Sequence, residues 1–424
     1  MITPRPHSAA TQVPALLVGS ALLRIGAAGG GVAVQFDLSD LAGGSPSGFV
    51  VGTVGAAQAA SELVFAFALA RVADRVGRSR FLIGGPLVGC VAMLLVAAST
   101  RPAQIAVARL VEGIGAAAFV PTALGTIAAA TSADPRARAQ ASGAFEGSTL
   151  VGFIGGFLVG GFAYHAFGRG AFVILAGFYL AAALVCALWI PRVPPMHTSP
   201  LKVVLHAIVG KGPIRTFIPA WLAVNALVGA WLLNLPALLK RTADENQTLV
   251  HHFDERVVSG ILGFWAMLLI LGIVLWTPFL QRHGGAVTMR RAVPGVFLVV
   301  GALFAMNHME GGRAVYLLPL AIVGVLWQAG FGPAAVAYLA DCSESLAADR
   351  SALMAFYTVT LAGGGALGAL IGGLFSGWLR IDGLLLLGLI LGTIAFVSLS
   401  GVVEYDRKYH LATRSAAAPS AGGP

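Results

Sequence analysis

Residues 49–99 read FVVGTVGAAQAASELVFAFALA, then RVADRVGRSR, then FLIGGPLVGCVAMLLVAAS, with the divisions after Ala70 and Arg80. The ten residues in the middle hold four arginines and one aspartate, and the runs on either side hold a single charge, Glu62. An α-helix needs about 20 consecutive apolar residues to cross a bilayer. The pattern therefore predicts two membrane-spanning helices joined by a short basic loop.

The rest of the chain repeats this pattern. Of its 424 residues 57% are hydrophobic and 11% charged, with a mean hydropathy of +0.84, whereas soluble proteins carry about 25% charged residues. The runs lack the alternation over about 10 residues that β-barrel strands show. We expect an all-α polytopic membrane protein. Its twelve predicted spans are residues 14–36, 49–70, 81–99, 104–130, 141–165, 171–190, 216–239, 257–280, 292–308, 314–340, 351–375 and 382–403.

The basic residues predict how the chain sits in the membrane. If the N-terminus is cytoplasmic, 18 Lys and Arg fall in cytoplasmic segments and 7 on the opposite side, as the positive-inside rule favours. The basic residues that give the net charge of +9 are therefore interpreted as setting the orientation in the membrane rather than as a nucleic-acid-binding surface. We expect a multi-pass protein of the plasma (inner) membrane with both termini cytoplasmic, and with a first span that is retained because no signal-peptide pattern precedes it.

A proline-rich stretch, 191–213, divides the chain. Proline at this density discourages regular helix. We expect an N-terminal six-helix bundle at residues 1–190, a cytoplasmic linker at 191–214, a C-terminal six-helix bundle at 215–405 and a disordered cytoplasmic tail at 406–424.

The two predicted bundles are similar to each other in sequence. At an offset of 212 residues Phe119 matches Phe331 and Pro121 matches Pro333, which indicates a duplicated six-span unit of the kind found in one large class of transporters. Glycines at every fourth position match as well, and such rows let helices approach closely, either in static packing or in sliding contact. The matching glycines are Gly152, Gly156 and Gly160 with Gly364, Gly368 and Gly372.

The loop quoted first resembles the signature of the major facilitator superfamily, Gly-x-x-x-Asp-Arg-x-Gly-Arg, with Ala70 in place of the first glycine. The resemblance implies two six-helix bundles and a gating role for Asp74, Arg75, Gly77 and Arg78, which would hold one alternating-access state closed. A helix cap or a solvated loop is the alternative role for Asp74. A weaker second copy at 277–284 has Gln281 where the acid would stand.

Two further stretches carry the resemblance. Arg109, Gly113 and Gly115 match the family's Arg-x-x-x-Gly-x-Gly motif, which is associated with proton coupling. Residues 151–156 resemble the antiporter motif Gly-Pro-x-x-Gly-Gly, but the proline is missing.

Ionisable residues within spans are candidates for function. Arg109 and Glu112 are three residues apart and can pair on one helix, either as a proton-linked switch or as a permanent structural pair. Glu62 and Glu146 are further candidate proton carriers. Arg24 would bind an anionic group or pair with one of these acids.

In the second half, polar side chains within spans can orient a ligand or join helices. These candidates for the substrate cavity are Asn225, Trp231, Asn234, Trp327 and Gln328. We hypothesise that proton coupling lies in the first half and substrate recognition in the second. For the loop that holds His251, His252, Asp254 and Glu255 we expect solvated side chains rather than a metal site.

The function predicted is secondary active transport of a small organic molecule by alternating access, as proton-coupled efflux by antiport. The alternatives are a proton symporter or uniporter for a sugar or organic anion, and a non-transporting membrane assembly or sensor protein. No nucleotide-binding loop or hydrolase motif occurs, so we expect no enzyme and no cofactor, with the proton gradient as driving force. The expected partners are substrate, protons and lipid, with the chain as a monomer.

Overall fold

The computed structural model describes residues 9–44, 46–131, 135–191, 212–240, 244, 246–250, 253–309, 311–344 and 350–417. Within these ranges the chain is helical and has no β-strand, only an isolated bridge between Asp244 and Gln247. The all-α prediction is confirmed. The first half comprises α1 (Ala9–Leu41), α2 (Gly48–Val76), α3 (Arg78–Ala98), α4 (Pro102–Ala130), α5 (Pro135–Phe167), the 3-10 turn η1 (Gly168–Gly170) and α6 (Ala171–Trp189).

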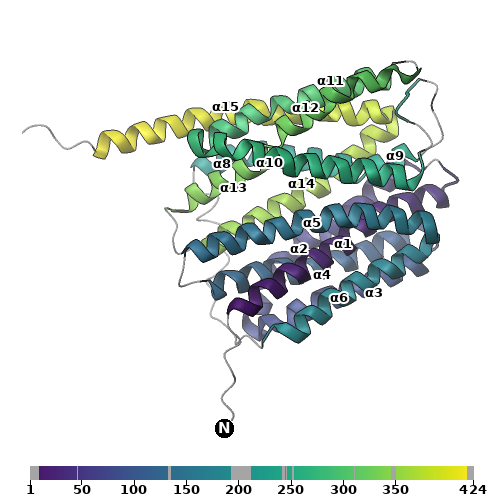
Figure 1. The fold of residues 1–424 in the computed structure, drawn as a ribbon, viewed down its shortest axis with the longest axis horizontal. Coiled ribbons are helices and arrows are strands. Elements are labelled where there is room, and N and C mark those ends of the chain that lie inside the picture. Colours follow the sequence, from purple (N-terminus) through teal and green to yellow (C-terminus); the bar gives the residue numbers. More distant parts are fainter. Residues whose placement is uncertain are drawn as a thin grey trace, which may run out of the picture.

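The second half begins after the predicted linker. Its elements are α8 (Gly212–Leu232), α9 (Leu235–Leu239), α10 (Glu255–Ala292), α11 (Pro294–Asn307), the 3-10 helix η2 (Gly311–Leu317), α12 (Leu318–Gln328), α13 (Phe331–Glu344), α14 (Arg350–Leu379) and α15 (Ile381–Ala417). In Figure 1 the first-half helices, purple to teal, lie together below the second-half helices, green to yellow. The helices run roughly side by side, so that the connections gather at two ends.

We call these the termini end and the far end. The termini end holds the start of α1, the end of α15 and the turns at Gly77 and Gly284. The far end holds the α1–α2 turn, η1 and the segment between α9 and α10. Under the predicted orientation the termini end is cytoplasmic.

Ten stretches of the described residues are long and apolar enough to cross a membrane. Two of them have 47 and 53 residues, too long for one crossing, and they join α5 to α6 and α10 to α11. The count of twelve crossings stays a prediction.

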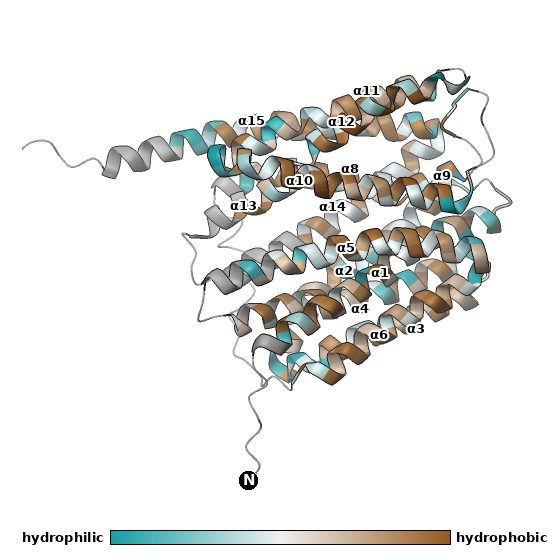
Figure 2. Cartoon of the chain, viewed as in Figure 1, coloured by the Kyte–Doolittle hydropathy of each residue, from teal (hydrophilic) through white to brown (hydrophobic). Residues whose placement is uncertain are grey.

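Figure 2 shows hydrophobic residues along the helices and more hydrophilic ones toward the two ends. Large apolar side chains such as Leu188 lie exposed on the outer surface. This chain is a multi-pass membrane protein.

Two predicted spans are broken in the structure. The span expected at 216–239 divides into α8 and α9 at Asn234, which precedes α9 and the proline in its first turn. The span expected at 314–340 divides between α12 and α13. Pro333 favours this break, because a proline ring crowds the helical carbonyl four residues earlier, here that of Ala329, but it does not impose one. Its repeat partner Pro121 lies within the continuous helix α4.

The predicted domain limits also differ from the helices. α8 begins at Gly212, inside the expected linker, and residues 192–211 lie outside the described residues. α15 continues to Ala417. Residues 406–417 are therefore helical, where the sequence predicted a disordered tail. Good helix formers and the ion pair between Glu404 and Lys408, four residues apart, favour helix there.

The glycine rows lie where helices touch. On α5, a Cβ added at Gly156 would come within 2.8 Å of the Ile25 carbonyl oxygen, and one at Gly160 within 2.7 Å of Gly29 Cα, both on α1. On α14, a Cβ at Gly372 would lie 2.9 Å from Ala230 Cα on α8, and Gly364 and Gly368 also face α8. The same close contact therefore occurs in both halves.

We expect Gly156→Ala to lower stability, because the added methyl group would push α1 away from α5. Overpacking of this kind costs about 1–3 kcal/mol. The melting temperature in detergent measures the effect. Gly177→Ala on α6 is the control, since nothing lies within 4 Å of the added Cβ, and equal melting temperatures for the two variants would contradict the prediction.

Candidate functional site

The turn between α2 and α3 assembles three of the four predicted gating residues. Gly77 has a φ of 111°, a conformation that favours glycine because it has no Cβ. The turn places Arg78 so that Nε donates to Asp74 Oδ1 at 2.7 Å and Nη1 donates to the Gly125 carbonyl on α4 at 2.7 Å. Arg75 is exposed. The turn thus attaches α2 and α3 to α4 through one arginine.

A second polar centre is buried in the middle of the first half. Arg109 and Glu112, 1% and 0% exposed, form an ion pair on α4. Arg109 Nη2 also donates to Gln58 Oε1 on α2 at 2.5 Å, and the Tyr179 hydroxyl of α6 donates to Glu112 Oε1 at 2.6 Å. The predicted pairing is present, and both carboxylate oxygens have partners. Burying the two charges together avoids the large cost of an unpaired buried ion.

Arg24 lies beside this centre on α1. Its charge acts on both Glu62 and Glu146, yet among the described residues it forms no ion pair with either carboxylate. Its guanidinium carbon lies 5.5 Å from the centroid of the Phe153 ring, and its Nε is buried without a hydrogen-bond partner. The expected structural pair between Arg24 and an acid is therefore not formed in this state.

The candidates on α8 and at the start of α9 mostly bond to the protein itself. Asn234 is fully buried, and its amide donates to the carbonyl oxygens of Ala230 at 2.9 Å and of Ala369, on α14, at 3.2 Å. Asn225 donates within its own helix. The indole nitrogen of Trp231 and the side-chain oxygen of Asn234 are buried without partners, so these two groups could meet a polar ligand.

Trp327 does not lie where the cavity prediction placed it. Its side chain is 46% exposed, and its Nε1 donates to the Arg291 carbonyl at 2.7 Å. α12 packs closely on α11 at this point, where a Cβ at Gly295 would meet the backbone nitrogen of Gln328 at 2.5 Å and Trp327 Cβ at 2.9 Å. Trp327 lines a surface cavity with Arg290 and Phe396 instead, and Gln328 is half-buried beside it.

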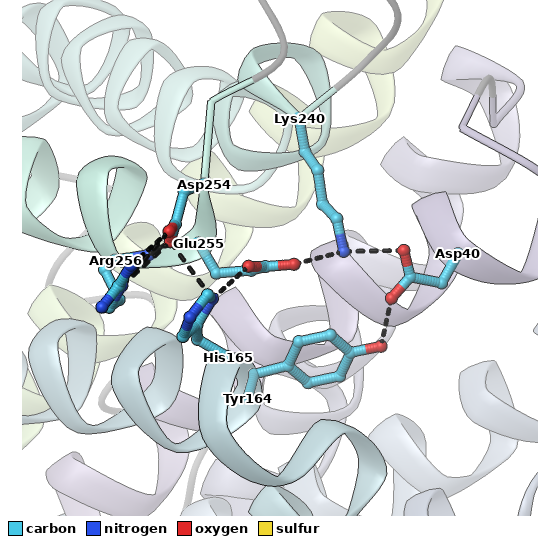
Figure 3. Close-up of polar contacts among 7 residues, drawn as sticks. All are labelled: Asp40, Tyr164, His165, Lys240, Asp254, Glu255 and Arg256. Carbon is cyan, nitrogen blue, oxygen red and sulfur yellow. Dashed lines mark hydrogen bonds and ion pairs between the residues drawn. The ribbon is translucent and has the colours of Figure 1, made fainter.

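The sequence analysis missed a cluster of charged side chains at the far end, drawn in Figure 3. Lys240, at the end of α9, is 8% exposed. Its Nζ lies 2.7 Å from Asp40 Oδ1 on α1 and 2.7 Å from Glu255 Oε1 on α10. Lys240 therefore joins the second half to the first. The far-end cluster consists of Asp40, Tyr164, His165, Lys240, Asp254, Glu255 and Arg256.

α5 contributes the remaining contacts of the far-end cluster. The Tyr164 hydroxyl lies 2.8 Å from Asp40 Oδ2, and His165 Nδ1 lies 3.0 Å from Glu255 Oε2 and 3.3 Å from Asp254 Oδ1. Arg256 donates to Asp254 and holds the pKa of that carboxyl below its usual range. The expectation of solvated side chains is wrong for Glu255, which pairs with Lys240 and His165, while His251 and His252 lie outside the described residues.

The atoms of His165, Asp254 and Glu255 that could ligate a metal lie within 4.8 Å of one another. Both carboxylates, however, already face a cation of the chain, Arg256 or Lys240. We interpret the trio as part of an ion-pair cluster between α5 and α10.

Close contacts at two glycines accompany the ion pairs at the far end. A Cβ at Gly52 on α2 would meet Gly373 Cα on α14 at 2.9 Å, and one at Gly263 on α10 would meet Leu158 Cδ2 on α5 at 2.9 Å. These contacts and Lys240 hold the two halves together at the far end. A sequence signal for the cluster did exist: Asp40 and Lys240 stand at the ends of apolar runs, where charges of two halves can meet.

We expect Lys240→Met to weaken closure of the far end. Because Asp40 is half-exposed, we expect the loss to be about 1–2 kcal/mol, below the value for a fully buried pair. Spin labels at Thr100 and Arg313, exposed positions of the two halves, should show a larger population of long distances by pulsed electron resonance. Arg256→Gln, which breaks an exposed pair within the start of α10, is the control. An unchanged distance distribution in K240M would contradict the prediction.

Comparison with known proteins identifies a matching family and several similar sequences. Residues 16–349 match the sequence profile of the Major Facilitator Superfamily. The methylenomycin A resistance protein of Bacillus subtilis is 27% identical over 272 residues, which are 58% of this chain and 57% of that protein. The uncharacterized MFS-type transporter EfpA of Mycobacterium tuberculosis is 27% identical over 218 residues, 48% of this chain and 40% of that protein. The chain thus aligns with about half the length of these relatives.

Solved structures show the same fold. The nucleoside transporter NupG superimposes with a TM-score of 0.71 at 15% identity, over 93% of this chain and 98% of that chain. A bacterial homologue of the human lysosomal transporter Spinster, in an inward-facing and unoccupied conformation, gives 0.70 at 17% identity, over 96% and 98%.

Proposed function

We propose that this chain, which belongs to the Major Facilitator Superfamily and is a membrane transporter of that type, exports a small organic molecule in exchange for protons. The observation that carries the proposal is the fully buried ion pair of Arg109 and Glu112, with Gln58 and Tyr179 as its remaining partners. An ionisable pair inside a membrane protein is costly and is a candidate for function.

Proton uptake would change this centre directly. A proton on Glu112 removes the negative charge that balances Arg109, and an unpaired charge in the interior costs several kcal/mol. Arg109 is then left with Gln58 as its only described partner. Because the partners lie on α2, α4 and α6, a movement of Arg109 would alter how these helices pack, and protonation would thus favour another conformation.

The far-end cluster would act as the gate that turns this change into alternating access, because it joins the halves in the present state. The turn of Asp74 and Arg78 at the termini end would keep α2, α3 and α4 together as the first half moves. We propose that the present state opens toward the termini end, with both termini cytoplasmic, the chain a monomer in the plasma membrane, and no cofactor. The name of the methylenomycin A resistance protein supports export.

An importer or uniporter of an organic anion is the second candidate. Arg24 supports it, because in the part of the chain that the structure describes its buried Nε has no hydrogen-bond partner and its guanidinium no paired carboxylate. The missing proline of the antiporter motif in span five also favours this alternative. A non-transporting assembly or sensor role is less well supported, because Asp74, Arg78, Arg109 and Glu112 are intact and in contact.

The substrate class can be identified by thermal shift. The purified protein would be melted at pH 5.5 and pH 8 with sugars, amino acids, organic anions and lipophilic cations. A ligand at 100 times its dissociation constant adds about 2.7 kcal/mol to stability. We expect a hit whose shift depends on pH. A hit from the organic anions that is lost in Arg24→Gln would favour the second candidate, and a pH-independent hit would count against proton coupling.

The coupling itself is tested with the ligand identified in that screen. In proteoliposomes we expect Glu112→Gln to abolish transport driven by a pH gradient while exchange of labelled for unlabelled ligand continues, because the variant cannot gain or lose the proton. Glu62→Gln and Glu146→Gln are tested in the same way, and the exposed Glu404→Gln is the control. Unchanged proton dependence in all three buried variants would rule out the proposal.

A further inference from the structure

A cavity of about 350 Å³ opens on the surface of the second half, outside the sites described so far. It lies between α10, α11, α12 and α15, toward the termini end, where α10 turns at Gly284 (φ 77°) into its last two turns. Its apolar lining includes Pro294, Trp327 and Phe396, and its charged lining is Arg290 and Arg291. The cavity is therefore apolar with two cations, both exposed, on one helix.

Among the described residues, no acidic side chain neutralises either arginine. None of the ion pairs among the described residues includes Arg290 or Arg291. Instead the guanidinium carbon of Arg290 lies 5.8 Å from the centroid of the Phe396 ring, and that of Arg291 lies 5.8 Å from the centroid of the Phe279 ring. Stacking on aromatic rings positions the two charges but leaves their N–H groups available.

The corresponding turn of the first half, at Gly77 between α2 and α3, has a different set of contacts. There Asp74 accepts from Arg78, which also donates to the Gly125 carbonyl. In the second copy Gln281 stands at the position of Asp74, and residues 281–292 hold three arginines and no acid. Because Gln281 replaces the acid, the arginines of this turn lack the carboxylate with which the signature motif would pair one of them.

The surroundings identify the missing partner. Trp327, which lines the cavity, is 46% exposed, and Val397, the neighbour of the lining residue Phe396, is 65% exposed. In a membrane protein, exposed apolar side chains of this kind meet lipid chains. The indole N–H of Trp327 already donates to the backbone carbonyl of Arg291, which leaves an apolar lining with two guanidinium groups that have no acidic partner among the described residues. Guanidinium groups bind phosphate through paired hydrogen bonds, and basic pockets between membrane helices on the cytoplasmic side bind anionic lipid headgroups.

We propose that this cavity binds an anionic phospholipid from the bilayer leaflet at the termini end. The phosphate lies against Arg290 and Arg291, and an acyl chain lies along Pro294, Trp327 and Phe396. A bound lipid would join the α10–α11 connection to α12 and α15. The proposal does not depend on the transported substrate or on proton coupling.

Native mass spectrometry of the purified protein tests the proposal, with phosphatidylglycerol, phosphatidylcholine and inorganic phosphate as probes. We expect phosphatidylglycerol to be retained and to raise the melting temperature, and phosphatidylcholine to bind at least tenfold more weakly. In the double variant Arg290→Gln, Arg291→Gln we expect the affinity for phosphatidylglycerol to fall by tenfold or more.

The matched control is the double variant Arg101→Gln, Arg313→Gln, which removes the same charge from exposed positions at the far end. It should retain phosphatidylglycerol. Both double variants should have the melting temperature of the unaltered protein in lipid-free detergent, because all four arginines are exposed. Equal lipid retention by the two double variants would overturn the proposal, as would inorganic phosphate raising the melting temperature as much as phosphatidylglycerol does.

Discussion

The arrangement of the helices depends on how closely their backbones can approach. In a bilayer the hydrophobic effect does not draw helices together, because lipid is as apolar as the side chains, and association relies on contact between backbones at small residues. The chain meets this constraint at α1 against α5, α8 against α14 and α2 against α14. In each pair an added Cβ would meet backbone atoms within 3 Å. The first two contacts organise each half, and the third joins the halves.

The buried charges occupy positions that this packing creates. The guanidinium of Arg109 lies 3.5 Å from the position that a Cβ at Gly30 would take and 3.7 Å from that at Gly31, so it packs against the glycines of α1. Glu112 and Gln58 then complete its coordination from α4 and α2. The centre is therefore a property of three helices held at short distance, and a change of helix packing and a change of its charge are coupled.

The two ends of the protein use charge in different ways. At the far end Lys240 of the second half binds Asp40 of the first, and this contact exists only while the halves are together. At the termini end Arg78 ties helices of one half to each other, and these contacts can persist when the halves separate. In the second half the corresponding turn has no acid, and its arginines face the lipid surface. The two corresponding turns thus differ: the α2–α3 turn binds helices of the first half together, and the turn at Gly284 offers its arginines to a ligand from outside.

The sequence by itself determined the fold class, the helical content and the membrane location, because apolar runs of about 20 residues have few alternatives in water or lipid. It also determined the local pairs, Asp74 with Arg78 and Arg109 with Glu112, since residues three or four apart on a helix are neighbours whatever the fold. The glycine rows followed from the spacing of four.

Only the tertiary structure decided which distant residues meet. The breaks at Asn234 and Ala329, the exposed position of Trp327 and the helical course of residues 406–417 depend on neighbouring helices or on sums of weak preferences. The far-end cluster brings together Asp40, His165, Lys240 and Glu255, which are far apart in the chain. No periodicity encodes such a meeting, because it depends on the distances between helices that the glycine contacts set.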